Sequence, residues 1–205
     1  MSGHFDSKLI PKCHDRLKKA KRSLQLCRGA RNFEEFESYW SEFLIHAGGV
    51  LNALDTGSKI TPQGRQWYGD IKRAGRNDPL VSYMHQARNI EEHDAQSVSE
   101  HNPGGVGIGG SGEDVYISNL VIGPEFFRNP ALAIKGKAWN QHGRTPSVSV
   151  TPAGPVLRPV TYRDVVFTPP TEHRGRPLAD TRPLAIGAAY IGYLEGLVRV
   201  AEEIS

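Results

Sequence analysis

Apolar residues recur at three- and four-residue steps through the first hundred positions, a spacing that predicts amphipathic helices. The clearest stripe predicts a helix over about 32–54, ended by Asp55-Thr56-Gly57. Aromatic residues at this spacing are typical of a packed core rather than of a surface that stacks on a ligand. The apolar positions of this stripe are Phe33, Phe36, Trp40, Phe43, Leu44, Ala47, Leu51 and Leu54.

Cap signals place three further helices in the first half of the chain. Thr61 and Asp78 are good N-cap residues, and each precedes a proline, which fits the first position of a helix. A basic segment before Gly29 adds another helix, whose lysines and arginines form either a solvated face or a surface that attracts phosphate. These predicted helices cover about 7 or 11 to 28, 62–73 and 79–98.

A final helix is predicted over about 183–204, and it is apolar on most sides. We expect it to be the central helix of a bundle. Ala188, Gly192 and Gly196 follow one another at four-residue steps, which would let another helix approach closely. Glu195 and Arg199 argue against a membrane span.

Between these helical regions the hydrophobic period changes to two, which predicts strands. Eleven of the 14 prolines lie in 103–183, so turns separate short strands there. The predicted fold class is mainly α (α+β): a single domain over 1–205, with a helical bundle over 7–101 and 180–205 and a small antiparallel β-sheet inserted over about 113–176, before the last helix. The predicted strands cover 115–122, 132–138, 147–150, 156–157 and 160–167.

Gly107-Ile108-Gly109-Gly110-Ser111-Gly112 matches the glycine spacing of a dinucleotide-binding loop. That mechanism needs a strand before the loop and a helix N-terminus after it. Here a helix precedes and a strand follows. We therefore expect a flexible linker over 104–112 and no cofactor.

Composition limits the class of protein. Hydrophobic residues make up 38% of the 205 residues, and no run approaches the roughly 20 apolar residues of a membrane span. The N-terminus has no apolar signal core, and Cys13 and Cys27 cannot form a disulfide scaffold or a four-cysteine zinc site. We therefore expect a cytoplasmic protein without a membrane partner. The net charge of +3 permits a nucleic-acid partner without requiring one.

The predicted helix over 79–98 carries the candidate chemistry. At about 100° per residue, its apolar positions occupy one arc and its polar residues the opposite one. A metal site is conceivable from His85, Glu92 and His93, but the two histidines stand about 12 Å apart along the axis, so we expect no metal. The polar residues of the outward arc are His85, Arg88, Asn89, Glu92 and His93.

These side chains match the needs of RNA cleavage without a metal. Arginine supplies a fixed cation with several donors for a phosphate. Histidine supplies a proton donor or acceptor near neutral pH, and asparagine can orient either group. Arg88 and His93 point about 140° apart, so two copies facing each other across a dimer axis would complete one site.

Arg88-Asn89, followed after three residues by His93, resembles the signature of the HEPN superfamily, an arginine four to six residues before a histidine. The resemblance implies a HEPN-like helical bundle that acts as a homodimeric, metal-independent endoribonuclease on RNA. It makes Arg88, Asn89 and His93 the candidate catalytic residues, with His85 and Glu92 as auxiliary ones. Family members often serve as toxins or in phage defence, some beside an antitoxin partner. The inserted sheet is not part of the usual bundle.

Plainer interpretations stay open. Arg88 could form a solvated salt bridge with Glu92 or Glu91, and His93 could be an ordinary exposed residue. The protein could then be a noncatalytic helical binding module whose sheet contacts a partner, or a structural protein of a phage or mobile element. His46 is expected to be a satisfied core histidine. No role is assigned to His101, His142 or His173, and the arginines over 158–182 either aid solubility or guide RNA.

Overall fold

A computed structural model describes residues 3–93, 97–109, 115–122, 134–140, 142–144, 148–151 and 153–205. The chain forms two compact units, one built from Met1–Glu100 with Pro155–Ser205 and the other from His101–Gly154. The predicted fold class is confirmed: the protein is mainly helical, with small antiparallel sheets before the last helix.

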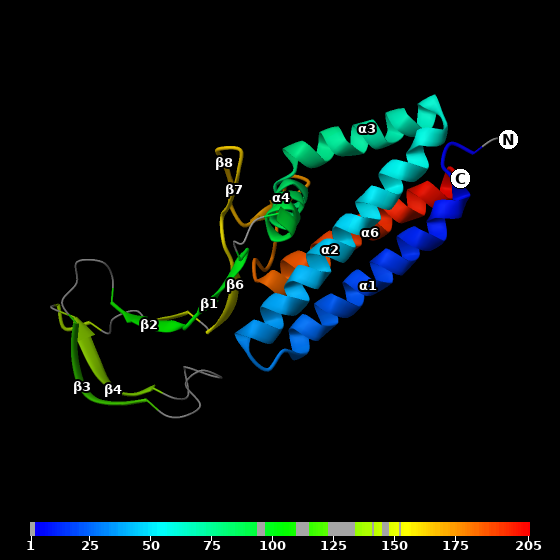
Figure 1. The fold of residues 1–205 in the computed structure, drawn as a ribbon. Helices are drawn as coiled ribbons and strands as arrows, with labels where there is room; N and C mark the ends of the chain where they lie inside the picture. Colours follow the sequence, from blue (N-terminus) through cyan, green and yellow to red (C-terminus); the bar gives the residue numbers. More distant parts are fainter. Residues whose placement is uncertain are drawn as a thin grey trace. The chain divides into compact units, whose positions relative to one another are not determined.

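Among the described residues, the helices all belong to the first unit. Helices α1, α2 and α6 run side by side and contact one another, while α4 contacts α2, α3 and α6 (Figure 1). The two ends of the chain meet, since the His4 amide donates to the Ile204 carbonyl over 2.6 Å. The helices are η1 (Ser7–Leu9), α1 (Ile10–Gly29), α2 (Phe33–Gly57), η2 (Ser58–Ile60), α3 (Pro62–Asn77), α4 (Pro79–His93) and α6 (Pro183–Glu203).

Side-chain caps begin three of these α-helices. The Asn32 side chain accepts from the Glu35 amide, Thr61 from the Gly64 amide, and Asp78 from the Val81 amide. Each bond satisfies a backbone N–H that the helix itself leaves without a partner. The N-caps predicted at Thr61 and Asp78 are therefore confirmed.

The predicted aromatic stripe of α2 forms the middle of the core. Phe36, Trp40 and Phe43 are buried, and their rings contact in series, with centroids 5.9 Å and then 5.0 Å apart. From α6, Ile186, Tyr190 and Leu194 are buried against the same cluster. Packing of these large side chains supplies most of the favourable free energy of folding.

The close approach to α6 occurs at a glycine outside the predicted seam. A Cβ at Gly187 would lie 2.6 Å from Leu24 and 3.2 Å from Trp40. In contrast, Ala188, Gly192 and Gly196 are exposed, so the prediction that this seam receives a helix is wrong for the described part of the chain. By length and composition α6 is also the one described helix that could cross a membrane, although nine of its residues are buried in the core.

The segment after α4 differs from its prediction. Helix α4 ends at His93 rather than 98, and strand β1 (Ser99–Asn102) follows. Strand β2 (Gly105–Ile108) pairs antiparallel with β5 (Val148–Thr151), so the expected linker is wrong over 105–108, because a partner strand satisfies its backbone. The remainder of the glycine run, residues 110–112, lies outside the described residues.

The described strands form separate two-stranded sheets rather than one sheet. The pairs are β1 with β6, β2 with β5, β3 with β4, β7 with β8, and β9 with β10. The predicted strand over 160–167 is a hairpin, because Arg163 and Asp164 adopt positive φ values of 50° and 63° and turn the chain. The strands not yet given are β3 (Val115–Ile122), β4 (Ile134–Asn140), β6 (Gly154–Leu157), β7 (Val160–Tyr162), β8 (Val165–Phe167), β9 (Glu172–His173) and β10 (Arg176–Pro177).

The predicted insertion, 113–176, is divided between the two units. Strands β7, β8 and β9 contact α4, and Leu157 and Val160 join the helical core. The Tyr83 hydroxyl of α4 donates to the Arg158 carbonyl over 2.8 Å. These contacts place the C-terminal part of the insertion with the helices.

Candidate functional site

A chain of polar contacts runs along one face of α4. The Arg88 guanidinium donates to the Glu92 carboxylate at 2.7 Å and to the Asn89 side-chain oxygen at 3.3 Å. The Asn89 amide nitrogen in turn lies 3.4 Å from His85 Nε2 and donates to Gln86. The structure therefore brings together four of the five predicted site residues. The fifth, His93, ends α4, and its side chain lies outside the described set.

Arg88 is not on a fully outward face, which corrects the helical-wheel prediction. Its side chain is only 21% exposed. A Cβ at Gly48 of α2 would lie 3.1 to 3.3 Å from Arg88 Nε, Cγ and Cδ, so the arginine stem lies flat across this glycine. Arg88 Nε is buried and has no hydrogen-bond partner among the described residues. A helical wheel of α4 could not predict this packing, because it represents one helix without its neighbours.

A second arginine crosses α2 at the next residue. A Cβ at Gly49 would lie 3.0 Å from Arg16 Cδ, and Arg16 Nη1 is 3.4 Å from Nδ1 of His46. Because Gly48 and Gly49 are consecutive, with Cα atoms about 3.8 Å apart, Arg88 from α4 and Arg16 from α1 flank the same turn of α2. Sequence reasoning missed Arg16. The sequence feature that could have revealed Arg16 is the glycine pair inside the strongly apolar helix α2, because such glycines indicate that another part of the chain approaches the helix closely.

A histidine with a lowered pKa lies near each arginine. Burial lowers the pKa of His85, and the positive charges of Arg88 and Lys72 lower it further. Burial and the charges of Arg16 and Lys19 likewise lower the pKa of His46, which is half-buried rather than a core residue. Since the ordinary value is about 6.5, both rings are mostly neutral at pH 7 and can accept a proton. The Asn89 amide and Arg16 guanidinium can only donate, which fits unprotonated ring nitrogens facing them.

A second polar cluster joins the start of α4 to β9. The Asp78 carboxylate, already the N-cap, lies 3.0 Å from His173 Nδ1 and accepts the Arg174 amide over 2.7 Å. The Arg174 guanidinium lies over the Tyr193 ring, 5.5 Å from its centroid. Sequence reasoning gave His173 no role, because its partner stands 95 residues earlier. The cluster fixes the β9–β10 hairpin to α4.

We expect Asp78→Ala to destabilise the protein by about 2–3 kcal/mol, because it removes a cap and charge-assisted hydrogen bonds. Burial raises the pKa of Asp78, but the Val81 and Arg174 amides and the His173 ring more than offset this and lower it overall. The stabilisation is therefore present above the unfolded value of about 3.9 and lost as pH falls through the lower folded pKa. Urea unfolding at pH 7 and pH 3 measures it, with Asp70→Ala, an exposed aspartate of α3, as control. Equal effects of the two variants at pH 7 would contradict a stabilising role for the Asp78 cluster.

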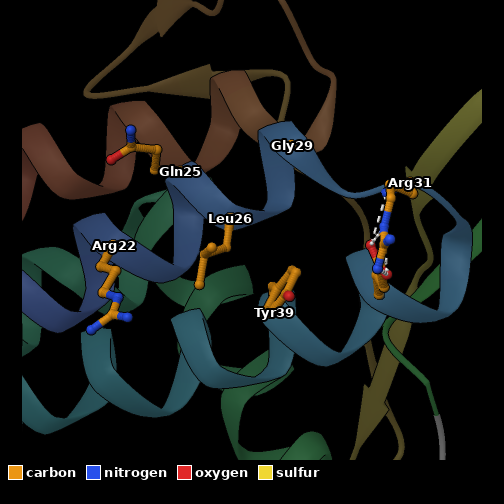
Figure 2. Close-up of a pocket in the computed structure, with 7 residues that line it drawn as sticks. Arg22, Gln25, Leu26, Gly29, Arg31 and Tyr39 are labelled. Atoms are coloured by element: carbon orange, nitrogen blue, oxygen red, sulfur yellow. Dashed lines mark hydrogen bonds and ion pairs between the residues drawn. The ribbon is translucent and has the colours of Figure 1, made fainter.

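A shallow pocket of about 480 Å³ lies between the end of α1 and the start of α2 (Figure 2). Arg31 at its edge is held by Glu35, with contacts down to 2.6 Å. Because no histidine lines it, the pocket lacks a group that transfers protons near neutral pH. The lining residues are Arg22, Gln25, Leu26, Gly29, Arg31, Glu35 and Tyr39.

Metal ligands do not gather in the described ranges, where no three His, Cys, Asp or Glu side chains lie close enough to share an ion. Cys13 and Cys27 are both free and buried. Burial raises the pKa of the Cys13 thiol to about 11 and that of Cys27 to about 12. Both therefore stay protonated and are poor nucleophiles at pH 7.

No protein-family model, curated protein or solved structure matches this chain. The functional argument therefore rests on the residues themselves.

Proposed function

We propose that the protein is a HEPN-like, metal-independent endoribonuclease that acts as a homodimer. The observation that carries the proposal is the pair of arginines at one turn of α2, Arg88 across Gly48 and Arg16 across Gly49. Arg16 contacts His46 directly, and Arg88 is linked to His85 through Asn89. Cations and neutral imidazoles are the groups that stabilise and transfer protons to a cleaving phosphodiester.

In this proposal an imidazole removes the proton of the ribose 2′-hydroxyl, and a second proton donor protonates the leaving 5′-oxygen. His93 and His85 are the candidates on α4. The Arg88 guanidinium contacts the phosphate oxygens as negative charge develops on them. Asn89 orients His85, whose Nε2 it faces. A second copy of the chain would bring a second set of these groups to the same phosphate.

Glu92 holds Arg88 in place before RNA binds. Its carboxylate contacts the Arg88 Nη2 at 2.6 Å and lies on the same side of α4. This ion pair fixes the planar guanidinium, so less side-chain entropy is lost when a phosphate arrives. The phosphate must then share or replace the carboxylate contact. A role as toxin or in phage defence, with an antitoxin partner, belongs to the same proposal.

The same ion pair favours a second candidate function, a noncatalytic binding module. Arg88 is already neutralised by Glu92 and packed on α2, as a residue that only holds two helices together would be. RNA cleavage distinguishes the two functions, because only the endoribonuclease would cut RNA.

We expect the purified protein to sediment at about twice 22.6 kDa at micromolar concentration and to cleave mixed cellular RNA in excess EDTA. His93→Ala should cut at least about a hundredfold more slowly, because it removes the proton-transfer group. Gel analysis of RNA and analytical ultracentrifugation measure the two properties. Intact RNA with a folded dimer would favour the binding module, and a monomer would exclude a composite site.

A further inference from the structure

Two aromatic side chains stand exposed and face to face on the β3–β4 hairpin of the second unit. Tyr116 is 53% exposed and Trp139 is 40% exposed. They are directly opposite each other in the antiparallel register, with ring centroids 6.3 Å apart and planes 19° from parallel. Cross-strand aromatic contact stabilises a hairpin, but it leaves the outer ring faces in water.

A hydrogen-bonded turn that carries an arginine follows Trp139 in the sequence. Asn140 follows Trp139 and is buried, and its side-chain oxygen accepts the amides of His142 and Arg144 over 3.0 and 2.9 Å. The Asn140 amide donates to the Arg144 carbonyl over 2.8 Å, and Gly143 supplies the positive φ of 72°. Arg144 itself is exposed. Its backbone is thus held within a few residues of Trp139.

Charged residues of both signs lie near this pair in the sequence. The described residues of this hairpin and turn, 115–122, 134–140 and 142–144, carry the cations Lys135, Lys137 and Arg144, whereas Glu113 and Asp114 precede β3. Exposed rings with cations in the same strand and turn complement a polyanion that exposes flat apolar faces. Single-stranded RNA has both properties, whereas base-paired RNA hides its base faces.

We propose that Tyr116 and Trp139 form a stacking site for unpaired bases of RNA, with Arg144 contacting the backbone phosphate. Every base has a face that stacks on an aromatic ring, so the site tolerates many sequences. The inference rests on the proposed function in taking RNA as the ligand, but it assigns these residues to binding and not to cleavage. The second unit would then contribute to RNA binding.

The test uses the full-length chain carrying His93→Ala, so that RNA stays intact, and a fluorescein-labelled 20-nucleotide oligouridine. Fluorescence anisotropy should show about tenfold weaker binding for Trp139→Val and for Tyr116→Val, since each loses one stacking face. Valine suits an exposed strand, so the hairpin is retained. Trp139→Phe and Tyr116→Phe keep a ring and should bind within about threefold of the parent. Tyr162→Ala, an aromatic residue beside Arg163 in the first unit, is the matched control and should bind like the parent.

Tryptophan emission supplies a second readout that a merely structural role would not change. Trp40 is buried and Trp67 partly buried, so quenching by RNA reports Trp139. Quenching should disappear in Trp139→Phe while anisotropy still shows binding. Arg144→Ala should weaken binding. The slope of the logarithm of the binding constant against the logarithm of the salt concentration should also become less steep by about one, as expected when one phosphate contact is lost.

Two results would overturn the stacking site. One is equal affinity of the parent and both valine variants, and the other is no binding of the oligonucleotide by the parent, which would point to a protein as the occupant of the pair. Failure of the endoribonuclease proposal is visible separately, as intact RNA with the wild-type protein in EDTA.

Discussion

Arg88→Ala is expected to slow RNA cleavage in EDTA by at least about a hundredfold, because it removes the guanidinium that we propose contacts the phosphate as negative charge develops on it. Arg88→Lys should recover only part of the rate, since an ammonium lacks the planar fork. Single-turnover cleavage of a labelled RNA measures both rates.

The contacts of Arg88 make a stability measurement part of this test. Its stem packs on Gly48, so Arg88→Ala should also lower the free energy of unfolding by roughly 1 kcal/mol through lost packing. Arg88→Lys keeps the stem and should unfold at nearly the wild-type midpoint. Arg73→Ala, an exposed arginine of α3, is the matched control and should change neither property. Full activity of Arg88→Ala would exclude the proposed role, and loss of folding in both variants would make Arg88 a structural residue.

Gly48→Leu is expected to have the second large effect, because the new side chain occupies the space of the Arg88 stem. Overpacking of this kind costs about 1–3 kcal/mol. The displaced arginine should also lose its contacts with Glu92 and Asn89, so cleavage should fall by about a hundredfold or more. Urea denaturation and RNA cleavage measure the two effects on one preparation.

Gly48→Ala separates function from stability at this position. Its Cβ would lie 3.1 Å from Arg88 Nε, so the arginine must shift by a few tenths of an ångström. Alanine also favours the helix by about 1 kcal/mol, which offsets the close contact and leaves the free energy of unfolding nearly unchanged. Cleavage should nevertheless fall. Gly69→Ala on α3, where a Cβ meets open space, is the control and should stabilise the protein without altering cleavage. Unchanged cleavage by both Gly48 variants would show that the position of Arg88 does not matter.

The sequence by itself determined the helices of the first unit and the middle of the core. The stripe through Phe36, Trp40 and Phe43 repeats at the helical period, and such a pattern has one face to bury. Thr61 and Asp78 mark helix starts because their short side chains reach amides three residues ahead. These features are local, so they can be read from neighbouring residues along the chain.

The position at which α4 ends and the structure of the glycine-rich segment could not be predicted from neighbouring residues. Gly105–Ile108 becomes a strand because Val148–Thr151 offers it backbone partners some forty residues later. Similarly, the turn at Arg163 and Asp164 divides an alternating pattern that looks continuous in sequence. Strand pairing joins distant segments, and the hydrophobic pattern of one segment does not specify its partner.

The candidate site was found in sequence only as one face of one helix, with His85, Arg88, Asn89, Glu92 and His93 at helical spacing. Tertiary structure decided that Arg88 lies across Gly48, that Arg16 lies across Gly49 and contacts His46, and that His173 faces Asp78. The physical reason is that a helical wheel fixes directions within one helix, whereas burial and the pKa of each group depend on the helices packed around it.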